Sequence, residues 1–245
     1  MKKKISEIIT NIFKYDLKIS EALIREGRVI VNNEKIIIPS LKFEETDVDI
    51  RFINMKLPYV SRGAYKLLEA IEKFNINLTD KICLDIGSST GGFVDVMLRH
   101  GAKKVYAVDC GTNQLAYELR INDKVVVYEK TNLKNLKKEM FLENIEFVSC
   151  DVSFISLKYV FEVCNKILNN NNINVVFLIK PQFEASSKYV EPGGYVNQEN
   201  HKYIIDKVIS YAKNNGFVLI DLIKSPILGE KSKNIEYLGF FRKDS

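Results

Sequence analysis

Beyond residue 57, short apolar segments alternate with segments whose apolar residues recur at helical spacing, and this alternation constrains the fold more than any other feature. The predicted strands cover residues 82–86, 105–109, 125–128, 145–150, 175–179, 217–223 and 235–241. The predicted helices cover residues 93–100, 113–121, 157–168 and 201–214. Such alternation produces right-handed crossovers and a parallel sheet, and near-continuous apolar strands indicate cover on both faces. The sequence therefore predicts an α/β domain with a mainly parallel, seven-stranded sheet.

The first 57 residues show a different pattern of shorter elements. The predicted helices lie at residues 5–12 and 19–24, and the predicted strands at residues 29–31, 36–38 and 48–53. Asn32 and Asn33 supply a turn between the first two strands. Pro58 marks a junction, so we place the boundary near Leu57. Two domains are expected, a small α+β domain at residues 1–57 and the α/β domain at residues 58–245.

Composition and charge limit the class of protein. Of the 245 residues, 46% are hydrophobic and 27% are charged, as in globular proteins. No apolar run approaches the roughly eighteen residues that cross a bilayer. Ser6 and Glu7 interrupt the N-terminal segment, so it does not have the apolar region of a signal peptide. We expect a cytoplasmic protein without stable membrane insertion, and the net charge of +5 weakly favours a polyanionic partner.

The cysteines do not predict a metal site. Cys83, Cys110, Cys150 and Cys164 contain no Cys-x-x-Cys pair, and the chain has two histidines. Structural zinc sites are usually built from paired ligands at short spacing. We therefore expect buried, reduced thiols and no bound metal.

A glycine-rich turn follows the first predicted strand of the second domain. Residues 85–93 read Asp-Ile-Gly-Ser-Ser-Thr-Gly-Gly-Phe, and a predicted helix follows. The glycines allow positive φ and close approach of a ligand, and the start of the helix offers free N–H groups. Because the spacing is not G-x-G-x-x-G, a dinucleotide is disfavoured.

Two acidic residues indicate which nucleotide-like ligand this turn binds. Asp109 ends the second predicted strand, twenty-two positions after Gly87, where a carboxylate can accept hydrogen bonds from both ribose hydroxyls of an adenosyl group. Asp85 suits a ligand with an amino group and a sulfonium. Each carboxylate could instead brace a loop, but together they favour S-adenosylmethionine. The expected cofactor contacts are Asp85, Gly87, Ser88, Ser89, Thr90, Gly91, Gly92, Phe93, Asp109, Asn132 and Asp151.

Four charged residues are candidates for catalysis. Asp151 and Lys180 follow the fourth and fifth predicted strands, at the sheet edge where ligands bind. Lys66 lies on a predicted helix before the first strand, and Glu236 is at the start of the last strand. Methylation of a hydroxyl needs a group that attracts or removes its proton, so Lys180 is either a base or a charged stabiliser of the alkoxide. Taken singly, each residue could equally belong to a turn or a surface ion pair.

The motifs together resemble the TlyA family, whose catalytic domain is FtsJ-like. They are YVSRGAYKL at 59–67, LDIGSSTGGF at 84–93, KKVYAVD at 103–109, DVSFIS at 151–156, LIKPQFE at 178–184 and NIE at 234–236. The resemblance covers nearly the whole chain. It implies an α-L type RNA-binding domain at 1–57 and a Rossmann-like class I methyltransferase domain at 58–245.

The resemblance also implies a reaction and a set of residues. The reaction is 2′-O-methylation of cytidine in ribosomal RNA, with S-adenosylmethionine as cofactor and ribosomal RNA or ribosomal subunits as partner. The family's catalytic tetrad falls on Lys66, Asp151, Lys180 and Glu236. The expected RNA contacts are Lys4, Lys14, Lys18, Arg25, Arg28 and Arg62. The chain departs from the family at Lys4-Ile5-Ser6 and at residues 16–20. The basic residues expected to contact RNA could instead form a merely solvated basic face.

Two other functions fit parts of the sequence. A methyltransferase for a small metabolite would use the same glycine-rich turn but would leave the first domain without a task. The family's older name, hemolysin, suggests a membrane-lytic protein. The lack of a predicted spanning segment and of a strongly amphipathic cationic helix argues against direct pore formation.

Overall fold

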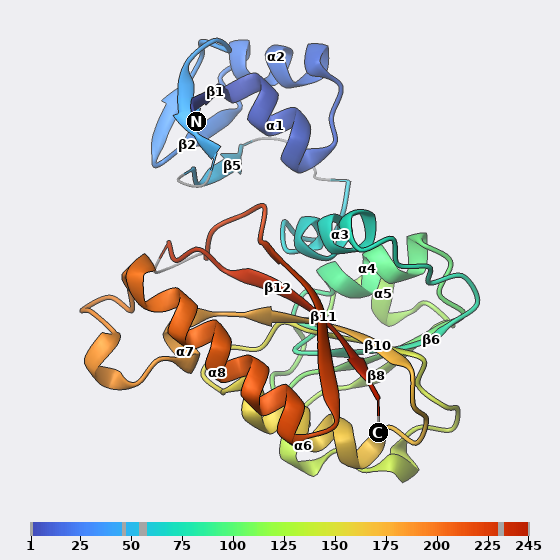
Figure 1. Ribbon diagram of the computed structural model, residues 1–245. Helices are drawn as coiled ribbons and strands as arrows, with labels where there is room; N and C mark the ends of the chain where they lie inside the picture. The colour runs from blue at the N-terminus through green and yellow to red at the C-terminus, as the bar shows by residue number, and fades with distance from the viewer. Residues whose placement is uncertain (1, 46–47, 54–57, 230–232, 245) are drawn as a thin grey trace.

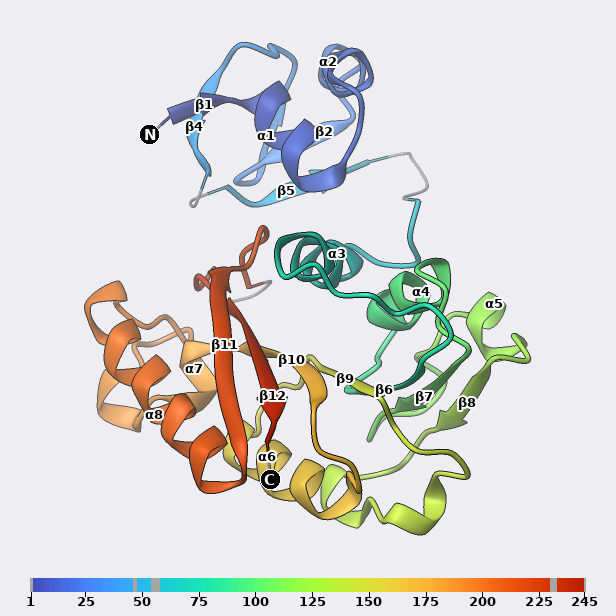
Figure 2. The ribbon, with the colours of Figure 1, turned by 45° about the vertical axis from the view of Figure 1, so that its right-hand side comes forward.

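The computed structural model describes residues 2–45, 48–53, 58–229 and 233–244. It contains a small N-terminal domain and a larger α/β domain, which lie one above the other in Figures 1 and 2. The predicted boundary at Leu57 lies outside the described residues.

Two short helices and five three-residue strands form the first domain. They are β1 (Lys2–Lys4), α1 (Ile5–Phe13), α2 (Leu17–Arg25), β2 (Val29–Val31), β3 (Glu34–Ile36), β4 (Lys42–Glu44) and β5 (Ile50–Phe52). Strands β1 and β4 pair with each other, and β3, β2 and β5 form a second antiparallel sheet. Both predicted helices are present because Ile5, Ile8, Ile9 and Ile12 lie on one buried face of α1 and Ile24 anchors α2.

The second domain is built on a seven-stranded sheet. Its strands are β6 (Ile82–Ile86), β7 (Lys104–Val108), β8 (Val125–Tyr128), β9 (Phe147–Cys150), β10 (Ile173–Ile179), β11 (Phe217–Lys224) and β12 (Tyr237–Lys243). The order is β11-β12-β10-β9-β6-β7-β8. The five strands from β10 to β8 are parallel, whereas β12 is antiparallel to both β10 and β11. The predicted mainly parallel, seven-stranded sheet is confirmed.

Helices cover both faces of this sheet, as the apolar strands predict. The helices are α3 (Ala64–Lys73), α4 (Gly92–Arg99), α5 (Tyr117–Arg120), α6 (Leu157–Ile167), α7 (Pro181–Glu184) and α8 (His201–Asn214). Apolar side chains of α3 and α4 pack on one face, and those of α6 and α8 on the other. Short 3₁₀ helices occur at Leu133–Asn135, Lys138–Met140, Ser187–Tyr189 and Gln198–Asn200.

Two sequence expectations need adjustment. The helix predicted at 113–121 is reduced to the single turn α5, because Asn113 has a left-handed φ of 54° and Ala116 has an extended ψ of 138°, so the helix begins only at Tyr117. Of the cysteines, Cys83, Cys150 and Cys164 are buried, but Cys110 is exposed because it lies in the loop after β7.

The core of the first domain extends onto the second. Tyr65 and Leu68 of α3, together with Ile227, are buried in the same apolar cluster as α1 and the short strands. Phe13 meets Tyr65 edge to face at a ring separation of 4.7 Å. Both views place the first domain over α3, so the helix that carries Lys66 also forms the domain interface (Figures 1 and 2).

Candidate active site

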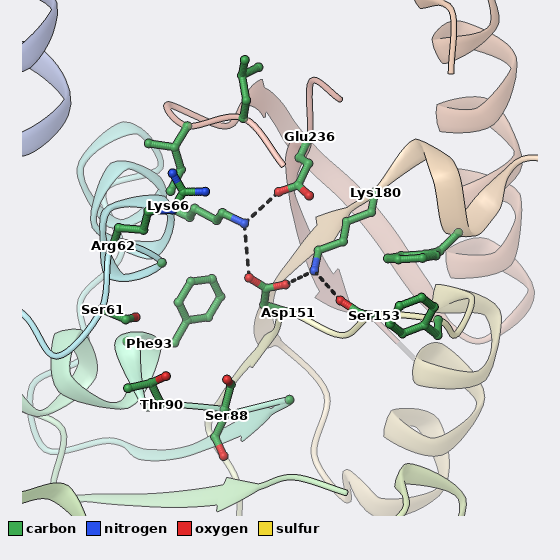
Figure 3. Close-up of a pocket in the computed structure, with 18 of the residues that line it drawn as sticks. Ser61, Arg62, Lys66, Ser88, Thr90, Phe93, Asp151, Ser153, Lys180 and Glu236 are labelled. Carbon is green, nitrogen blue, oxygen red and sulfur yellow. Dashed lines mark hydrogen bonds and ion pairs between the residues drawn. The ribbon is translucent and has the colours of Figure 1, made fainter. Parts of the chain in front are cut away.

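A cavity of about 640 Å³ opens at the carboxyl edge of the parallel strands. The glycine-rich turn lines one side, and the segments that follow β9 and β10 line the other. Figure 3 shows that Lys66, Asp151, Lys180 and Glu236 point toward one another beside this space.

Local geometry explains the glycines of the turn. Gly87 has a φ of 82°, and a Cβ on it would lie 2.6 Å from the backbone oxygen of Asp151. A Cβ on Gly92 would lie 2.8 Å from the backbone nitrogen of Ala64, where α3 begins. A side chain at either position would push the turn away from the segments that carry Asp151 and Lys66.

Asp85 is a buried carboxylate with one unsatisfied oxygen. Its Oδ1 accepts a hydrogen bond from Ser149 Oγ at 2.7 Å, and its Oδ2 has no partner among the described residues. Burial raises the pKa of Asp85 to about 7, and the nearby charges of Asp151 and Asp109 add to this, although the Ser149 hydrogen bond opposes it. Asp85 lines the cavity, so its free oxygen can receive a cationic amino group there.

Asp109 ties two loops together. Asp109 follows β7 directly. Its Oδ2 accepts a hydrogen bond from the Ser89 backbone N–H at 2.8 Å, and its Oδ1 accepts one from the Gly111 backbone N–H at 2.7 Å. Because an ionised carboxylate has about four acceptor positions, two remain for ligand hydroxyls. Asn132, also expected at the cofactor, is exposed, and its side chain accepts from the Lys134 N–H at 3.0 Å. Asn132 caps the start of a 3₁₀ helix, and neither it nor Asp109 is among the residues that line the cavity. The two loops are neighbours, because the Thr131 N–H donates to the Asp109 carbonyl at 3.0 Å.

The four catalytic candidates come together from four distant segments. Lys66 Nζ donates to Glu236 Oε2 at 2.7 Å and to Asp151 Oδ2 at 3.4 Å. Lys180 Nζ forms an ion pair with Asp151 Oδ1 and donates to Ser153 Oγ at 3.1 Å. The result is a chain of alternating charges, Glu236–Lys66–Asp151–Lys180, along one wall of the cavity (Figure 3).

Burial and charge set the ionisation of this chain. Burial by itself would raise the pKa of Asp151, but the two neighbouring lysines outweigh it, and the pKa is lowered. Burial would likewise lower the pKa of Lys66, but Asp151 and Glu236 outweigh it, and the pKa is raised. Lys66 therefore remains a cation and Asp151 an anion at neutral pH, which fixes the position of Lys180 at the cavity.

Sequence reasoning did not identify an aromatic pair at the cavity. Phe154 is 84% exposed, and its ring lies 5.0 Å from that of Phe183. Both residues line the cavity, and Phe154 has a left-handed φ of 63°, which is strained for a bulky side chain. Each phenylalanine stands three positions after a catalytic candidate, Asp151 or Lys180. Their proximity in sequence to these two candidates is the signal that could have identified the pair.

Two buried polar residues hold the surrounding loops and were also missed. Glu184 accepts from Ser156 Oγ and from the Leu157 N–H, both at 2.6 Å, which fixes the segment that follows Asp151. Asn234 donates to Gly194 O at 2.8 Å and accepts from the Val196 N–H at 2.9 Å. Both residues lie in motifs that the sequence analysis quoted.

Most of the basic residues expected to contact RNA are paired with carboxylates. The pairs are Lys4–Glu7 (3.6 Å), Lys14–Glu72 (2.8 Å), Arg25–Glu21 (2.9 Å), Arg28–Glu26 (2.7 Å) and Arg62–Asp49 (2.8 Å). Lys14 also pairs with Glu69, so its amine faces α3. Lys18 is exposed on α2.

The seven-stranded fold and the cavity at its glycine-rich turn define the class as a Rossmann-like methyltransferase. The model of the FtsJ-like methyltransferase family matches residues 59–243. The chain is 43% identical to hemolysin A of Brachyspira hyodysenteriae over 91% of this chain and 92% of the relative. It is 35% identical to the 16S/23S rRNA (cytidine-2′-O)-methyltransferase TlyA of Mycobacterium tuberculosis, over 90% of this chain and 82% of the relative. This chain therefore belongs to the FtsJ-like methyltransferase family, among the TlyA and hemolysin A proteins.

Solved structures agree with this assignment. A Streptococcus thermophilus protein with a provisional hemolysin name is 37% identical and superposes with a TM-score of 0.77, covering 100% of this chain and 89% of that protein. Within the part of the chain that the structure describes, no helix is both long and apolar enough to cross a membrane.

Proposed function

We propose that this enzyme transfers the methyl group of S-adenosylmethionine to the ribose 2′-hydroxyl of cytidine in ribosomal RNA. The observation that carries the proposal is the buried Glu236–Lys66–Asp151–Lys180 chain beside the glycine-turn cavity. The Mycobacterium tuberculosis relative supports it through the reaction in its name. This substrate implies a cytoplasmic location, where ribosomes are found.

The residues of the cavity fit the cofactor. Asp85 Oδ2 is the partner for the amino group, because it is buried and unsatisfied among the described residues. The glycine-rich turn and the start of α4 line the cavity at Gly87, Gly92 and Phe93, where the rest of the ligand can lie. Asp109 has acceptor capacity left for the ribose hydroxyls. S-adenosylmethionine supplies an activated methyl group on its sulfonium.

Lys180 is the residue that acts on the target hydroxyl. Its ammonium reaches the cavity at the end of β10, while Asp151 and Ser153 hold it from behind. Held by its ion pair with Asp151, Lys180 orients the hydroxyl oxygen and stabilises the negative charge that develops on it as the methyl group is transferred and the hydroxyl proton passes to water. Lys66 and Glu236 keep Asp151 in place.

Two further observations favour RNA over a small metabolite. The exposed Phe154 and the half-buried Phe183 at the cavity suit an unstacked base, since single-stranded RNA bases stack on aromatic side chains. The first domain packs on α3 next to the cavity and carries exposed basic residues that can dock on phosphates.

Ribosomal RNA lacking the modification provides the test. Ribosomal subunits from cells without this enzyme are incubated with the purified protein and methyl-labelled S-adenosylmethionine. A 2′-O-methyl group blocks alkaline cleavage of the adjacent phosphodiester, so the label should appear in alkali-resistant dinucleotides that begin with cytidine. Label in mononucleotides, or no label in RNA, would refute the proposal.

A matched pair of variants assigns the label to this site. Lys180→Ala should reduce labelling by about a hundredfold or more, which is the usual contribution of a positioned group that handles a proton. Lys158→Ala removes an exposed lysine that pairs with Glu162 on α6, outside the cavity, and should retain full labelling.

A further inference from the structure

Asp49 of the first domain is a buried carboxylate that faces two cations of the second domain. It is 3% exposed. Arg62 donates to its Oδ1 at 2.8 Å and Lys233 donates to its Oδ2 at 2.5 Å. Arg51, from its own domain, lies 3.6 Å from Oδ2. One side chain thus connects the first domain to two separate segments of the catalytic domain.

The backbone of Asp49 is fixed within the first domain. Its N–H donates to Asn32 Oδ1 at 2.8 Å, and its carbonyl accepts from the Asn32 N–H at 3.0 Å. Asn32 forms the turn between β2 and β3, and β5 begins directly after Asp49. The carboxylate therefore moves with the first domain as a body.

The two cations lie next to catalytic residues. Arg62 stands four positions before Lys66, at the turn that opens α3, where the Lys66 N–H bonds to the Gly63 carbonyl at 3.0 Å. Lys233 stands three positions before Glu236. Since Lys66 and Glu236 are themselves paired at 2.7 Å, the contacts close a ring: Asp49 to Arg62, along the chain to Lys66, across to Glu236, and along the chain to Lys233.

The rest of the interface is of a different kind. Phe13, Tyr65, Leu68 and Ile227 meet in an apolar cluster, and apolar contacts are non-directional. The Asp49 contacts are directional, and a buried carboxylate that loses a partner is left uncompensated. Burial would raise the pKa of Asp49, but Lys233 and Arg62 outweigh it and the pKa is lowered, so the carboxylate stays charged.

We propose that Asp49 is a positioning residue, which couples the seating of the first domain to the alignment of Lys66 and Glu236. The apolar cluster holds the domains together, and Asp49 sets their relative position. A first domain that docks on RNA would thereby act on the alignment of the catalytic chain through Asp49. The second part of this inference rests on the proposed function, whereas the coupling itself does not.

Asp49→Asn tests the coupling, because it removes the charge at almost constant shape. The single-turnover methylation rate on ribosomal RNA should fall by roughly tenfold, within the range usual for coupled sites. Affinities for RNA and for S-adenosylmethionine should remain within about twofold of those of the unaltered protein. Glu34→Gln, which neutralises an exposed carboxylate on β3 of the same domain, should leave all three quantities unchanged. A rate equal to that of the unaltered protein would overturn the proposal.

A second variant and a second readout separate positioning from general damage. Lys233→Met removes a half-exposed partner of Asp49. The loss of methylation rate that it causes should not add to the loss caused by Asp49→Asn in the double variant. Hydrogen exchange in Asp49→Asn should accelerate in residues 61–68 and 233–240 and stay unchanged in β6 to β9. Additive losses, or exchange that accelerates throughout the chain, would overturn the proposal. If the unaltered protein does not methylate ribosomal RNA, the proposed function fails, while the exchange pattern still decides the coupling.

Discussion

The basic surface residues of the first domain and the catalytic chain of the second pair their charges in different ways. In the first domain, Arg25 pairs with Glu21 one helical turn away, and their side chains are 62% and 33% exposed. In the catalytic domain, Lys66 and Glu236 pair across 170 positions of sequence, and their side chains are 10% and 3% exposed. Surface pairs contribute little, and an RNA phosphate can replace the carboxylate. Buried pairs fix a geometry. The basic residues of the first domain are therefore suited to exchanging a carboxylate for a phosphate, whereas the catalytic chain is suited to keeping its arrangement.

Breaking one pair of each kind should give the largest contrast. Glu236→Gln leaves the Lys66 ammonium buried with Asp151 as its remaining partner, and should lower the free energy of unfolding by about 3 kcal/mol. Glu7→Gln removes an exposed partner of Lys4 and should change it by less than about 0.5 kcal/mol. Urea denaturation measures both. Equal effects would contradict the distinction between the two domains.

Asp109 should show an effect of intermediate size, on ligand binding. Replacement by alanine removes the acceptor for the Ser89 and Gly111 N–H groups and for the ribose hydroxyls, and hydrogen bonds to charged groups contribute roughly 1.5–3 kcal/mol. Calorimetry should therefore show S-adenosylmethionine affinity reduced by at least about tenfold. Asp206→Ala, which removes an exposed carboxylate on α8, is the matched control. Unchanged affinity in a folded Asp109→Ala protein would remove Asp109 from the cofactor site.

The pH dependence of cofactor binding should report on Asp85. Its pKa is about 7, and the ionised form binds a cationic amino group. The affinity should therefore be fully developed above pH 7 and fall as pH drops through 7, by about tenfold between pH 8 and pH 6. Asp85→Asn should bind more weakly and lose this dependence. A flat profile in the unaltered protein would show that Asp85 does not face the cofactor.

The smallest effect is expected on the surface of the first domain. Lys18→Gln should weaken RNA binding a few-fold and reduce the log–log salt slope by roughly 0.7–0.9. Lys166→Gln, an exposed lysine at the far end of α6, should leave the slope unchanged. Identical slopes for the two variants would argue that α2 does not contact phosphate.

The sequence was most informative where apolar patterns are strong. The catalytic sheet was predictable because its central strands are buried on both faces and therefore read as continuous apolar runs. Strands β1 and β4 were not predicted, since Lys2–Lys4 and Lys42–Glu44 are only three residues long and consist of charged residues apart from Phe43. The catalytic residues were placed by their position at strand ends and by family resemblance.

Long-range partners could not be predicted. The Asp49–Lys233 contact joins residues 184 positions apart, and neither residue has a distinctive local pattern. Phe154 is exposed through a left-handed backbone that its residue type does not favour. Both features arise from tertiary packing, which periodicity does not encode.

The antiparallel insertion of β12 has a consequence for how the enzyme is made. This strand lies between β10 and the edge strand β11 but follows both in sequence, so β11 has no neighbour in the sheet until β12 has been synthesised. Glu236, at the start of β12, arrives with it, and until then Lys66 lacks its nearest carboxylate. The catalytic chain of a newly made protein is therefore complete only after β12 has inserted between β10 and β11.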